Sequence, residues 1–342
     1  MTITVLKPGL QTQVQDTGRW GWQADGVPVG GAMDGWSHRL ANLLVGQDED
    51  MASLEMLMNG PQLRFDVAAR IAITGAELSP TIGGQLVPMR CRVDVPAGAT
   101  LSFGRREAGL HAYLAVAGGI DVPPMLGSRS TYVRGAMGGI DGRALQAGDV
   151  LPIGTPASSS TPGGDDAAAA LRTPDAGCAF AAWPAPALDL LTMLPLPEPQ
   201  ACATVAVVAG EHWHDFDEEA RQSFLSQRWR IGGQSDRMGY RLEGRALGLP
   251  STGEMLSEGV AFGTVQVPPA GLPIVLMAER ASLGGYPKIA HVAGVDLPLL
   301  AQLAPGQALR FELVELDLAQ ALLEDRARQE ARLCARLLAA TA

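Results

Sequence analysis

The sequence predicts a mainly β protein whose two halves are related to each other and which ends in a helix. Its 342 residues include 41 Gly and 24 Pro, and these separate short β-branched runs such as ITVL, RIAIT, AYLAV and TVAVVA. A weak internal repeat indicates the related halves, because segments of the second half match segments of the first in the same order. An amphipathic stretch over residues 316–338 predicts the C-terminal helix.

The repeat is clearest between MDGWSHRL and SDRMGYRL, in which Asp34 aligns with Asp236 at an offset of 202. Later matches keep their order while the offset drifts only from 201 to 208, and they end with PAGATLSF against PGQALRF. Chance matching in a chain rich in Gly and Leu is the alternative, but the shared order favours duplication. We therefore expect two β domains that face each other, with a ligand in the cleft between them.

The individual elements follow from local patterns. The first 19 residues alternate apolar and polar side chains, which predicts a first strand rather than a targeting peptide. Short helices are expected over residues 35–45 and 217–225. A flexible insertion is expected over residues 155–177, where Ser, Pro, Gly and Ala dominate.

A Pro-rich stretch at residues 183–200 predicts an extended connection near a domain boundary. The predicted domains are therefore residues 1–200, with the insertion, and residues 201–342, with the terminal helix.

Composition restricts the function. The 26 Lys and Arg against 36 Asp and Glu give a net charge of −10, which disfavours nucleic acid and anionic membranes as partners. Apolar runs are interrupted well before the ~18 residues that a membrane span needs. The four Cys are far apart, which argues against a disulfide framework or a zinc site and favours a cytoplasmic location.

The densest polar cluster lies in three segments of the second half: SDRMGYRLEG, LSEGVAFGTVQVPP and AERASLGGYPKIA. Arg237 can hold a carboxylate or phosphate through two parallel hydrogen bonds, and Lys288 supplies a point charge. Gly284 and Gly285 allow a ligand to approach the backbone and offer amide donors. These residues predict a site for an anionic ligand, with Tyr286 beside it.

Structural explanations for the same segments stay open. Asp236 can fix a turn, Glu258 can be a surface charge on an edge strand, and GGYP can be a tight hairpin, because motif matches without structural context are weak. Gln266 lies in the apolar run TVQVPP. It is either a core amide with internal partners or an amide that reads a ligand.

In the first half, the Gly-rich segment over residues 15–34 resembles a dinucleotide-binding fingerprint only superficially, since no βαβ pattern surrounds it. It is either an ordered loop packed by its two Trp, or a loop that lines a cleft and presents Asp16, Arg19 and Asp34. The repeat favours the second interpretation, because it sets Asp34 opposite Asp236.

Other catalytic motifs give less support. His212 and His214 in EHWHDFDEE would share one face of a strand, but the sequence offers no convincing third metal ligand, and a loop is the preferred interpretation. No G-x-S-x-G elbow and no Walker A loop occur in the sequence. Triad hydrolases and P-loop kinases are therefore disfavoured.

Taken together, long ordered strings carry a family resemblance: VLKPGLQTQVQDTGRWGWQADGVPVGGAMD, HAYLAVAGGIDVPPMLGSRSTYVRGAMGG, SDRMGYRLEG, GTVQVPP, GGYPKIAHV and LPLLAQLAPGQALRF. The chain resembles the family that includes the C subunit of bacterial 5-oxoprolinase, the kinase-inhibitor antagonist protein of sporulation, allophanate hydrolase subunit 2 and the carboxyltransferase part of urea amidolyase. The resemblance covers nearly everything except residues 155–200 and the final helix.

The resemblance implies two cyclophilin-like β-barrel domains and an ATP-dependent 5-oxoprolinase that opens 5-oxoproline to L-glutamate. It also implies a direct partner, the B subunit of that enzyme, and a further partner, its A subunit. The B and C subunits would activate the lactam by phosphorylation, with ATP and Mg as its counter-ion. Arg237, Lys288 and Glu258 would then be catalytic. The substrate-binding residues would be Gln266, Tyr286, Gly284, Gly285, Asp236, Asp34 and Arg19.

One departure from the family concerns the strand that enters the GGYP turn. Relatives commonly read ADRQTTGGYPK where this chain has AERASLGGYPK, so an amide and a hydroxyl are lost, which can alter substrate choice.

Two other functions remain open. The first is a urea-type carboxyltransferase, for which biotin would have to arrive in trans, because no attachment segment of the AMKM type is present. The second is a non-enzymatic regulator that binds an inhibitor of a sensor kinase.

Overall fold

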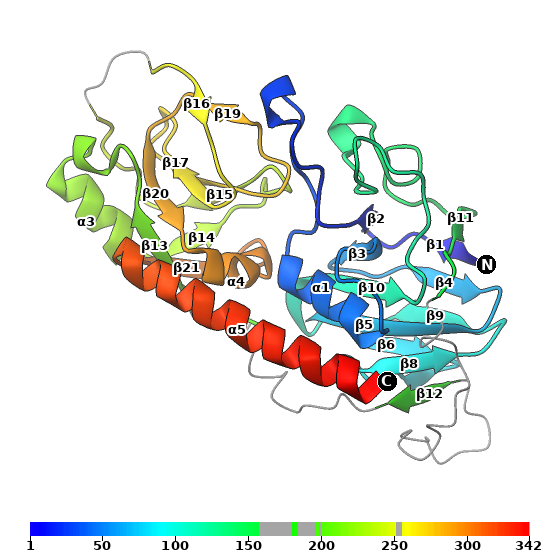
Figure 1. Ribbon diagram of the computed structural model, residues 1–342. Helices are drawn as coiled ribbons and strands as arrows, with labels where there is room; N and C mark the ends of the chain where they lie inside the picture. The colour runs from blue at the N-terminus through cyan, green and yellow to red at the C-terminus, as the bar shows by residue number, and fades with distance from the viewer. Residues whose placement is uncertain (157–179, 184–195, 198–199, 251–254, 342) are drawn as a thin grey trace. The chain divides into compact units, whose positions relative to one another are not determined.

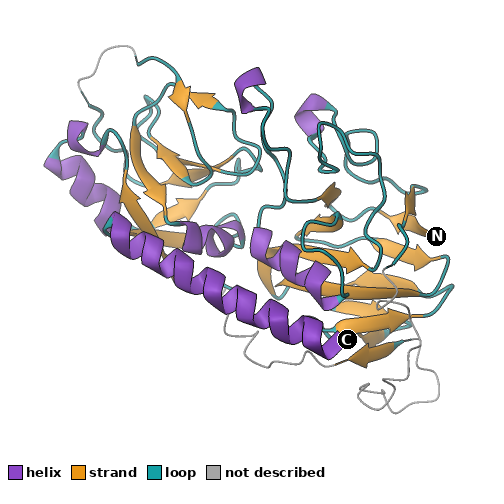
Figure 2. Cartoon of the chain, in the orientation of Figure 1, coloured by secondary structure: helices purple, strands orange, loops and turns teal. Residues whose placement is uncertain are grey.

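The protein is described by a computed structural model over residues 1–156, 180–183, 196–197, 200–250 and 255–341. Strands outnumber helices among the described residues and form every sheet and the barrel, which confirms the predicted mainly β class (Figure 2). The predicted insertion at 155–177 and connection at 183–200 fall almost wholly outside the described residues.

Grouped by their proximity in space, the residues form two compact units. The first contains Met1–Gly18, Asp34–Leu196 and Ala331–Ala342, and the second contains Arg19–Met33 and Pro197–Glu330. The Gly- and Trp-rich loop at the start of the chain thus groups with the second unit. The division into domains 1–200 and 201–342 stays a prediction about how the chain folds.

The first unit holds two six-stranded antiparallel sheets (Figure 1). The first has the order β11-β1-β4-β9-β6-β7. Its strands are β1 (Thr2–Lys7), β4 (Gln62–Phe65), β6 (Pro80–Ile82), β7 (Gln85–Leu86), β9 (Thr100–Phe103) and β11 (Val150–Pro152). The second has the order β12-β8-β5-β10-β3-β2. Its strands are β2 (Gln11–Gln15), β3 (Ser53–Leu57), β5 (Ala69–Glu77), β8 (Arg92–Val95), β10 (Ala108–Val116) and β12 (Ala181–Trp183).

The core of this unit is formed by the buried side chains of its strands. In β1 the residues Ile3 and Val5 are buried while their neighbours are not, as expected for a strand with one face on the core. The central strands β5 and β10 are almost continuously buried and pair with each other, so their apolar runs lie in the middle of the second sheet.

Helix α1 (Gly35–Leu44) lies against β5 and β10, and confirms the helix predicted over residues 35–45. Asp34 is its N-cap and accepts hydrogen bonds from the Ser37 N–H at 3.0 Å and the Ser37 hydroxyl at 2.6 Å. Gly46, with φ of 78°, follows the C-cap residue Val45 and allows the chain to leave the helix. The unit also contains the 3₁₀ turn η2 (Val133–Gly135).

The second unit is built on a closed seven-stranded barrel with the order β13-β20-β17-β18-β15-β14-β21. Its strands are β13 (Cys202–Ala209), β14 (Trp229–Ile231), β15 (Gly239–Glu243), β17 (Thr264–Gln266), β18 (Ile274–Leu276), β20 (Lys288–Val292) and β21 (Ala308–Leu313). β13 runs parallel to β21, and the other strand pairs of the barrel are antiparallel. A separate two-stranded sheet joins β16 (Glu258–Gly259) to β19 (Leu283–Gly284).

Helix α3 (Glu218–Ser226) confirms the helix predicted over residues 217–225, with Asp217 as its N-cap. Its Phe224 packs on the barrel, stacked on Phe311 of β21 with ring centroids 4.6 Å apart. The smaller helical elements of this unit are η1 (Gln23–Asp25), η4 (Trp213–Asp215), η5 (Gly294–Asp296) and α4 (Leu297–Ala301).

The chain ends in helix α5 (Leu316–Thr341), which confirms the predicted C-terminal helix. The helix carries charged pairs one turn apart, of which Arg326 and Glu330 are 3.0 Å apart. Among the helices that the structure describes, none is long and apolar enough to cross a membrane.

The internal repeat corresponds to equivalent elements only in part. PAGATLSF and PGQALRF both form a turn followed by a strand, β9 in one case and β21 in the other. The strongest match does not: Asp34 caps helix α1, whereas Asp236 lies in the turn before β15. The side chain of Asp suits both places, because it accepts backbone hydrogen bonds at a helix start and in a tight turn.

Candidate functional site

Lys288 is the centre of a polar cluster at the end of the barrel in the second unit. It begins β20 and pairs with Gln266 of β17, and the register between the two strands shifts next to this pair. Such a bulge turns a side chain away from the regular alternation of a strand. The Lys288 side chain is almost completely buried, which is unusual for a lysine and requires partners for its ammonium group.

Two carboxylates supply those partners. The Lys288 Nζ lies 2.8 Å from Glu258 Oε2 and 3.5 Å from Glu211 Oε1. Burial lowers the pKa of Lys288, but the hydrogen bond to Glu258 and the two negative charges outweigh it, so the pKa ends above its usual value. The hydrogen bond from Lys288 in turn lowers the pKa of Glu258. The group is therefore a charged ammonium at neutral pH.

Glu211 connects Lys288 to His291, another residue of β20. Its Oε2 lies 2.9 Å from His291 Nε2, and His291 Nδ1 lies 3.1 Å from the Thr264 hydroxyl. His212 also contacts the Lys288 backbone. The ring Nδ1 of His212 accepts a hydrogen bond from the Lys288 backbone N–H at 3.2 Å, and the backbone N–H of His212 donates to the Lys288 carbonyl at 3.1 Å. Glu211 and His291 are members of this cluster that the sequence did not indicate.

The predicted substrate-binding residues Gln266, Gly284 and Tyr286 lie together beside Lys288. The buried Gln266 amide donates to the Tyr286 carbonyl at 3.3 Å. A Cβ at Gly284 would collide with that amide. Gly284 also pairs with Glu258 across β16 and β19, so direct contacts connect Lys288, Glu258, Gly284, Gln266 and Tyr286.

The outer part of this cluster is accessible. The Tyr286 side chain is 45% exposed, and the Glu258 side chain is half exposed. A Cβ at Gly285 would be 3.4 Å from the Ser257 hydroxyl. The cluster thus combines a buried cation with two partly exposed carboxylates and an exposed aromatic ring at its rim.

Arg237 occupies a different setting. Its Nε donates to Glu279 Oε1 at 2.5 Å and its Nη2 donates to the Gly31 carbonyl at 2.5 Å, while the Glu279 N–H donates to the Arg237 carbonyl at 2.7 Å. Both side chains of this ion pair are buried. Arg237 therefore binds the loop at residues 19–33 to the barrel, together with a hydrogen bond from the Gly30 N–H to the Ala278 carbonyl. Its predicted catalytic role stays a prediction.

The remaining predicted residues also have local roles. The Asp236 carboxylate accepts from the Met238 and Gly239 N–H groups at 2.8 and 3.2 Å and so forms the turn before β15. Arg19 is buried in the 19–33 loop, where its N–H donates to the Val29 carbonyl at 2.8 Å. Asp34 belongs to the first unit as the cap of α1, and its predicted place opposite Asp236 across a cleft remains a prediction.

A second buried polar network lies under α1 in the first unit. The Tyr113 hydroxyl donates to Glu55 at 2.7 Å and accepts from the Asp34 N–H at 2.8 Å. Burial and the charge of Glu55 raise the pKa of Tyr113 well above its usual value. His38 Nδ1 lies 2.8 Å from the Ser53 hydroxyl, and burial lowers the pKa of His38 to about 4. Tyr113 and His38 are thus buried groups that stay neutral near pH 7, and they do not form an exposed site.

The mainly β fold, with a closed barrel in its second unit, is that of a carboxyltransferase-type domain. The family described as "Carboxyltransferase domain, subdomain A and B" matches residues 25–313, and the chain belongs to it.

Two relatives match over almost their whole length. The chain is 35% identical over 335 residues to the C subunit of the 5-oxoprolinase of Escherichia coli, covering 98% of each chain. It is 36% identical over 315 residues to the protein of the same name from Haemophilus influenzae, covering 92% of each. These findings confirm the family resemblance seen in the sequence.

A solved structure extends the comparison. The crystal structure of the K. lactis urea amidolyase matches with a TM-score of 0.84 and 30% identity over 97% of this chain. The chain spans only 20% of that protein. Its fold is thus shared with one part of a much longer protein.

Proposed function

We propose that this chain is the C subunit of a 5-oxoprolinase, which opens 5-oxoproline to L-glutamate together with a B and an A subunit and with consumption of ATP. The observation that carries the proposal is the match to the C subunit of the Escherichia coli 5-oxoprolinase over 98% of both chains. The buried ammonium of Lys288, beside the partly exposed Glu258 and Tyr286, supports the binding of an anionic ligand by the same chain.

In this proposal Lys288 stabilises negative charge that develops on the lactam oxygen or on the transferred phosphoryl group. A fixed cation in a water-poor site stabilises such charge far better than one in bulk water. Glu258 is the catalytic partner that keeps Lys288 charged, and its exposed carboxylate is the partner that an incoming anion can replace. Glu211, tied to His291, stays in place and holds the ammonium in position.

Gln266 and Tyr286 then bind the lactam. A lactam has one N–H donor and one carbonyl acceptor, and the Gln266 amide offers one group of each kind beside Lys288. Tyr286 presents an exposed ring at the rim, suited to cover the five-membered ring of the substrate. The backbone at Gly284 and Gly285 leaves room for close approach.

ATP fits this cluster only with a counter-ion. Lys288 carries one positive charge, whereas Glu211 and Glu258 carry two negative charges, so the phosphates of ATP alone would be repelled. Mg²⁺ is commonly bound by one or two carboxylates together with substrate phosphates, and Glu211 and Glu258 offer such carboxylates. When bound, the nucleotide would supply the phosphoryl group that activates the lactam. On this basis we propose ATP with Mg, and the proposed use of ATP favours a cytoplasmic location.

Urea-type carboxyl transfer is the second candidate. It is favoured by the close structural match to part of the urea amidolyase. In that case Lys288 would stabilise the oxyanion of a urea or amide substrate, and carboxybiotin would come from another chain.

Reconstitution distinguishes the two. The chain is mixed with its B and A partners, and ATP hydrolysis is measured with and without 5-oxoproline. The proposal predicts turnover that depends on 5-oxoproline and on all three chains. Turnover that instead requires urea and carboxybiotin would replace it with the carboxyltransferase function.

A further inference from the structure

Lysine is almost absent from this chain. Of its 26 basic residues, 24 are Arg and only two are Lys, at positions 7 and 288. One of the two is the buried centre of the candidate site. A primary ammonium is a compact point charge on a flexible stem, unlike a guanidinium. Because the chain uses Arg at nearly every other basic position, the second lysine, Lys7, is also a candidate for a specific role.

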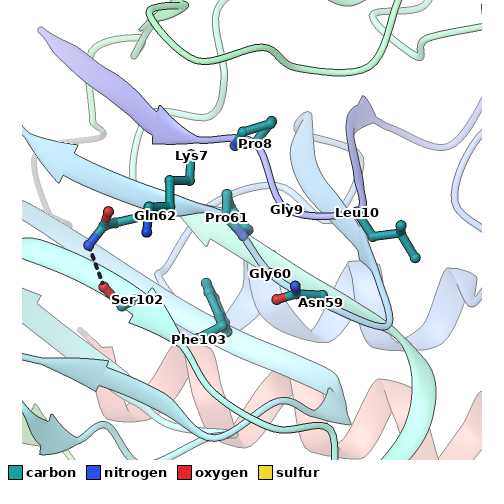
Figure 3. A pocket seen from close by; sticks show the side chains of 10 residues that line it. All are labelled: Lys7, Pro8, Gly9, Leu10, Asn59, Gly60, Pro61, Gln62, Ser102 and Phe103. Carbon is teal, nitrogen blue, oxygen red and sulfur yellow. Dashed lines mark hydrogen bonds between the residues drawn. The ribbon is translucent and has the colours of Figure 1, made fainter.

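Lys7 lines a hollow of its own in the first unit. The hollow has a volume of about 600 Å³ and lies where the turn between β1 and β2 meets the turn between β3 and β4 (Figure 3). This volume lies within the range of small-molecule sites. Its lining residues are Lys7, Pro8, Gly9, Leu10, Asn59, Gly60, Pro61, Gln62, Ser102 and Phe103.

The walls of the hollow are fixed by close backbone packing. Gly9 has φ of 74°, and a Cβ there would lie 2.5 Å from the Asn59 carbonyl oxygen. Gly60 packs directly on the Phe103 ring, so that a Cβ at this position would overlap the ring. The Leu10 N–H donates to the Asn59 carbonyl at 3.3 Å. The two turns therefore hold each other, and the hollow is part of the fold rather than a gap between loose loops.

A β-bulge places Lys7 at this wall. The register of β1 on β4 shifts between Val5 and Lys7, and Lys7 is thereby set opposite Gln62. In a regular strand, the side chains of Leu6 and Lys7 would point to opposite faces of the sheet. Because of the bulge, both residues are exposed.

The polar groups of the hollow lie mainly on one side, where Figure 3 shows Lys7, Gln62 and Ser102 together, with Asn59 on the opposite side. Within the part of the chain that the structure describes, neither the Lys7 ammonium nor the Asn59 amide has a side-chain hydrogen bond or ion pair. Gln62 Nε2 donates to the Ser102 hydroxyl oxygen at 3.2 Å, which leaves the Ser102 hydroxyl hydrogen for a ligand. The Lys7 ammonium and the Ser102 hydroxyl, on the same side of the hollow, are donors for a carboxylate.

The apolar groups match the other end. Phe103, Pro61 and Leu10 offer an aromatic ring and two aliphatic surfaces, and Leu10 is 63% exposed. A single positive charge beside apolar surface suits a monocarboxylate with a short hydrocarbon body better than a phosphate, which carries more charge and no apolar part. We propose that the hollow around Lys7 is a binding site for a small organic carboxylate, separate from the Lys288 cluster and independent of the function proposed above.

The scarcity of lysine makes a direct test possible. Reductive methylation with ¹³C-formaldehyde labels only the α-amino group, Lys7 and Lys288, and leaves the charge of each amine intact. The Lys7 signal is assigned by its loss in Lys7→Arg, and the Lys288 signal by its loss in Lys288→Arg. Butyrate, acetate and inorganic phosphate are then titrated separately, and the ¹³C-methyl signals are followed by NMR.

The site predicts a saturable shift of the Lys7 signal with butyrate, with a dissociation constant of about millimolar for so small a ligand. Acetate should bind several-fold more weakly, and phosphate should give no saturation at the same ionic strength. Gln62→Glu, which sets a negative charge opposite Lys7 in the pairing of β1 with β4, should abolish the shift. The matched control Gln234→Glu, an exposed change of the same charge in the second unit, should not.

Three results would overturn the proposal: a Lys7 signal that moves linearly with all three salts, a response to phosphate alone, or an unchanged butyrate titration in Gln62→Glu. Because the readout is the Lys7 signal itself, each result is independent of whether the chain takes part in 5-oxoproline turnover.

Discussion

The amide of Gln266 fills the space that a side chain at Gly284 would occupy. The two residues belong to different sheets of the second unit, the barrel strand β17 and the two-stranded sheet β16-β19. Their contact joins the sheet that carries Glu258 to the strand next to Lys288. The shape of the candidate site therefore depends on the absence of a side chain at position 284.

Gly284→Ala should destabilise the protein by about 1–3 kcal/mol, the usual cost of overpacking a filled site. The added methyl group must push the Gln266 amide out of its hydrogen bond to the Tyr286 carbonyl. Thermal unfolding measures the loss. The control is Gly259→Ala in the same small sheet, where a Cβ meets nothing within 4 Å. Equal melting temperatures for both variants would contradict the packing described here.

Arg237→Met should cost about 3–5 kcal/mol of stability, because it removes the ion-pair partner of the buried Glu279. It should also release the loop at residues 19–33, which the Gly31 carbonyl fastens to Arg237. Urea unfolding and proteolysis of that loop are the measurements. The double variant Arg237→Met, Glu279→Met should recover much of the stability. A stable single variant that lost only ligand binding would instead restore Arg237 as a binding residue.

The ion pair of Lys288 and Glu258 predicts a broad pH range of stabilisation. The pKa of Glu258 is lowered, so its contribution is complete above the ordinary value of 4.5 and is lost as the pH falls through the folded pKa. The pKa of Lys288 is raised in spite of burial, so its contribution is complete below 10.5 and is lost as the pH rises through the folded pKa.

The difference in melting temperature between the wild type and Lys288→Met should therefore be constant near neutral pH and shrink at both extremes. Glu258→Gln should weaken the acid part of this dependence and leave the alkaline part, because Glu211 still faces Lys288. A difference that does not change with pH would show that Lys288 stabilises by packing alone.

His38 should make the protein less stable in mild acid. Its pKa is lowered by burial to about 4 against an ordinary value of 6.5, so below 6.5 the unfolded chain binds a proton that the folded chain excludes. Stability is then lost as the pH falls from 6.5 toward 4, by about 3 kcal/mol in total. His38→Asn should remove most of this loss in urea unfolding, whereas the exposed His214→Asn should not. The same pH dependence in wild type and His38→Asn would contradict it.

Much of the candidate site follows from the sequence because its parts lie in short, recognisable segments. Gly284, Tyr286 and Lys288 are close neighbours in GGYPK, and Glu258 reaches them through the pairing of two short strands. Gln266 stands out as a polar residue in an apolar strand. The helices at 35–45, 217–225 and 316–338 follow equally well, since caps and periodicity are local signals.

The rest depends on long-range register. Glu211 reaches Lys288 because β13 pairs with β20, and nothing near Glu211 in the sequence indicates that pairing. In the same way, Arg237 lies in a polar segment of the sequence, and nothing near it there indicates that its side chain is buried. Its partners Glu279 and Gly31 lie 42 and 206 residues away, and only the fold brings them together.

The most direct test of the central claim is 5-oxoproline-dependent ATP hydrolysis by the three-subunit assembly containing Lys288→Met, compared with wild type and His214→Asn. The account predicts that Lys288→Met still assembles with its partners but loses about 100-fold or more in turnover, as expected when a fixed cation is removed from developing charge. His214→Asn should match wild type. Full turnover by an assembly that contains Lys288→Met would contradict the account.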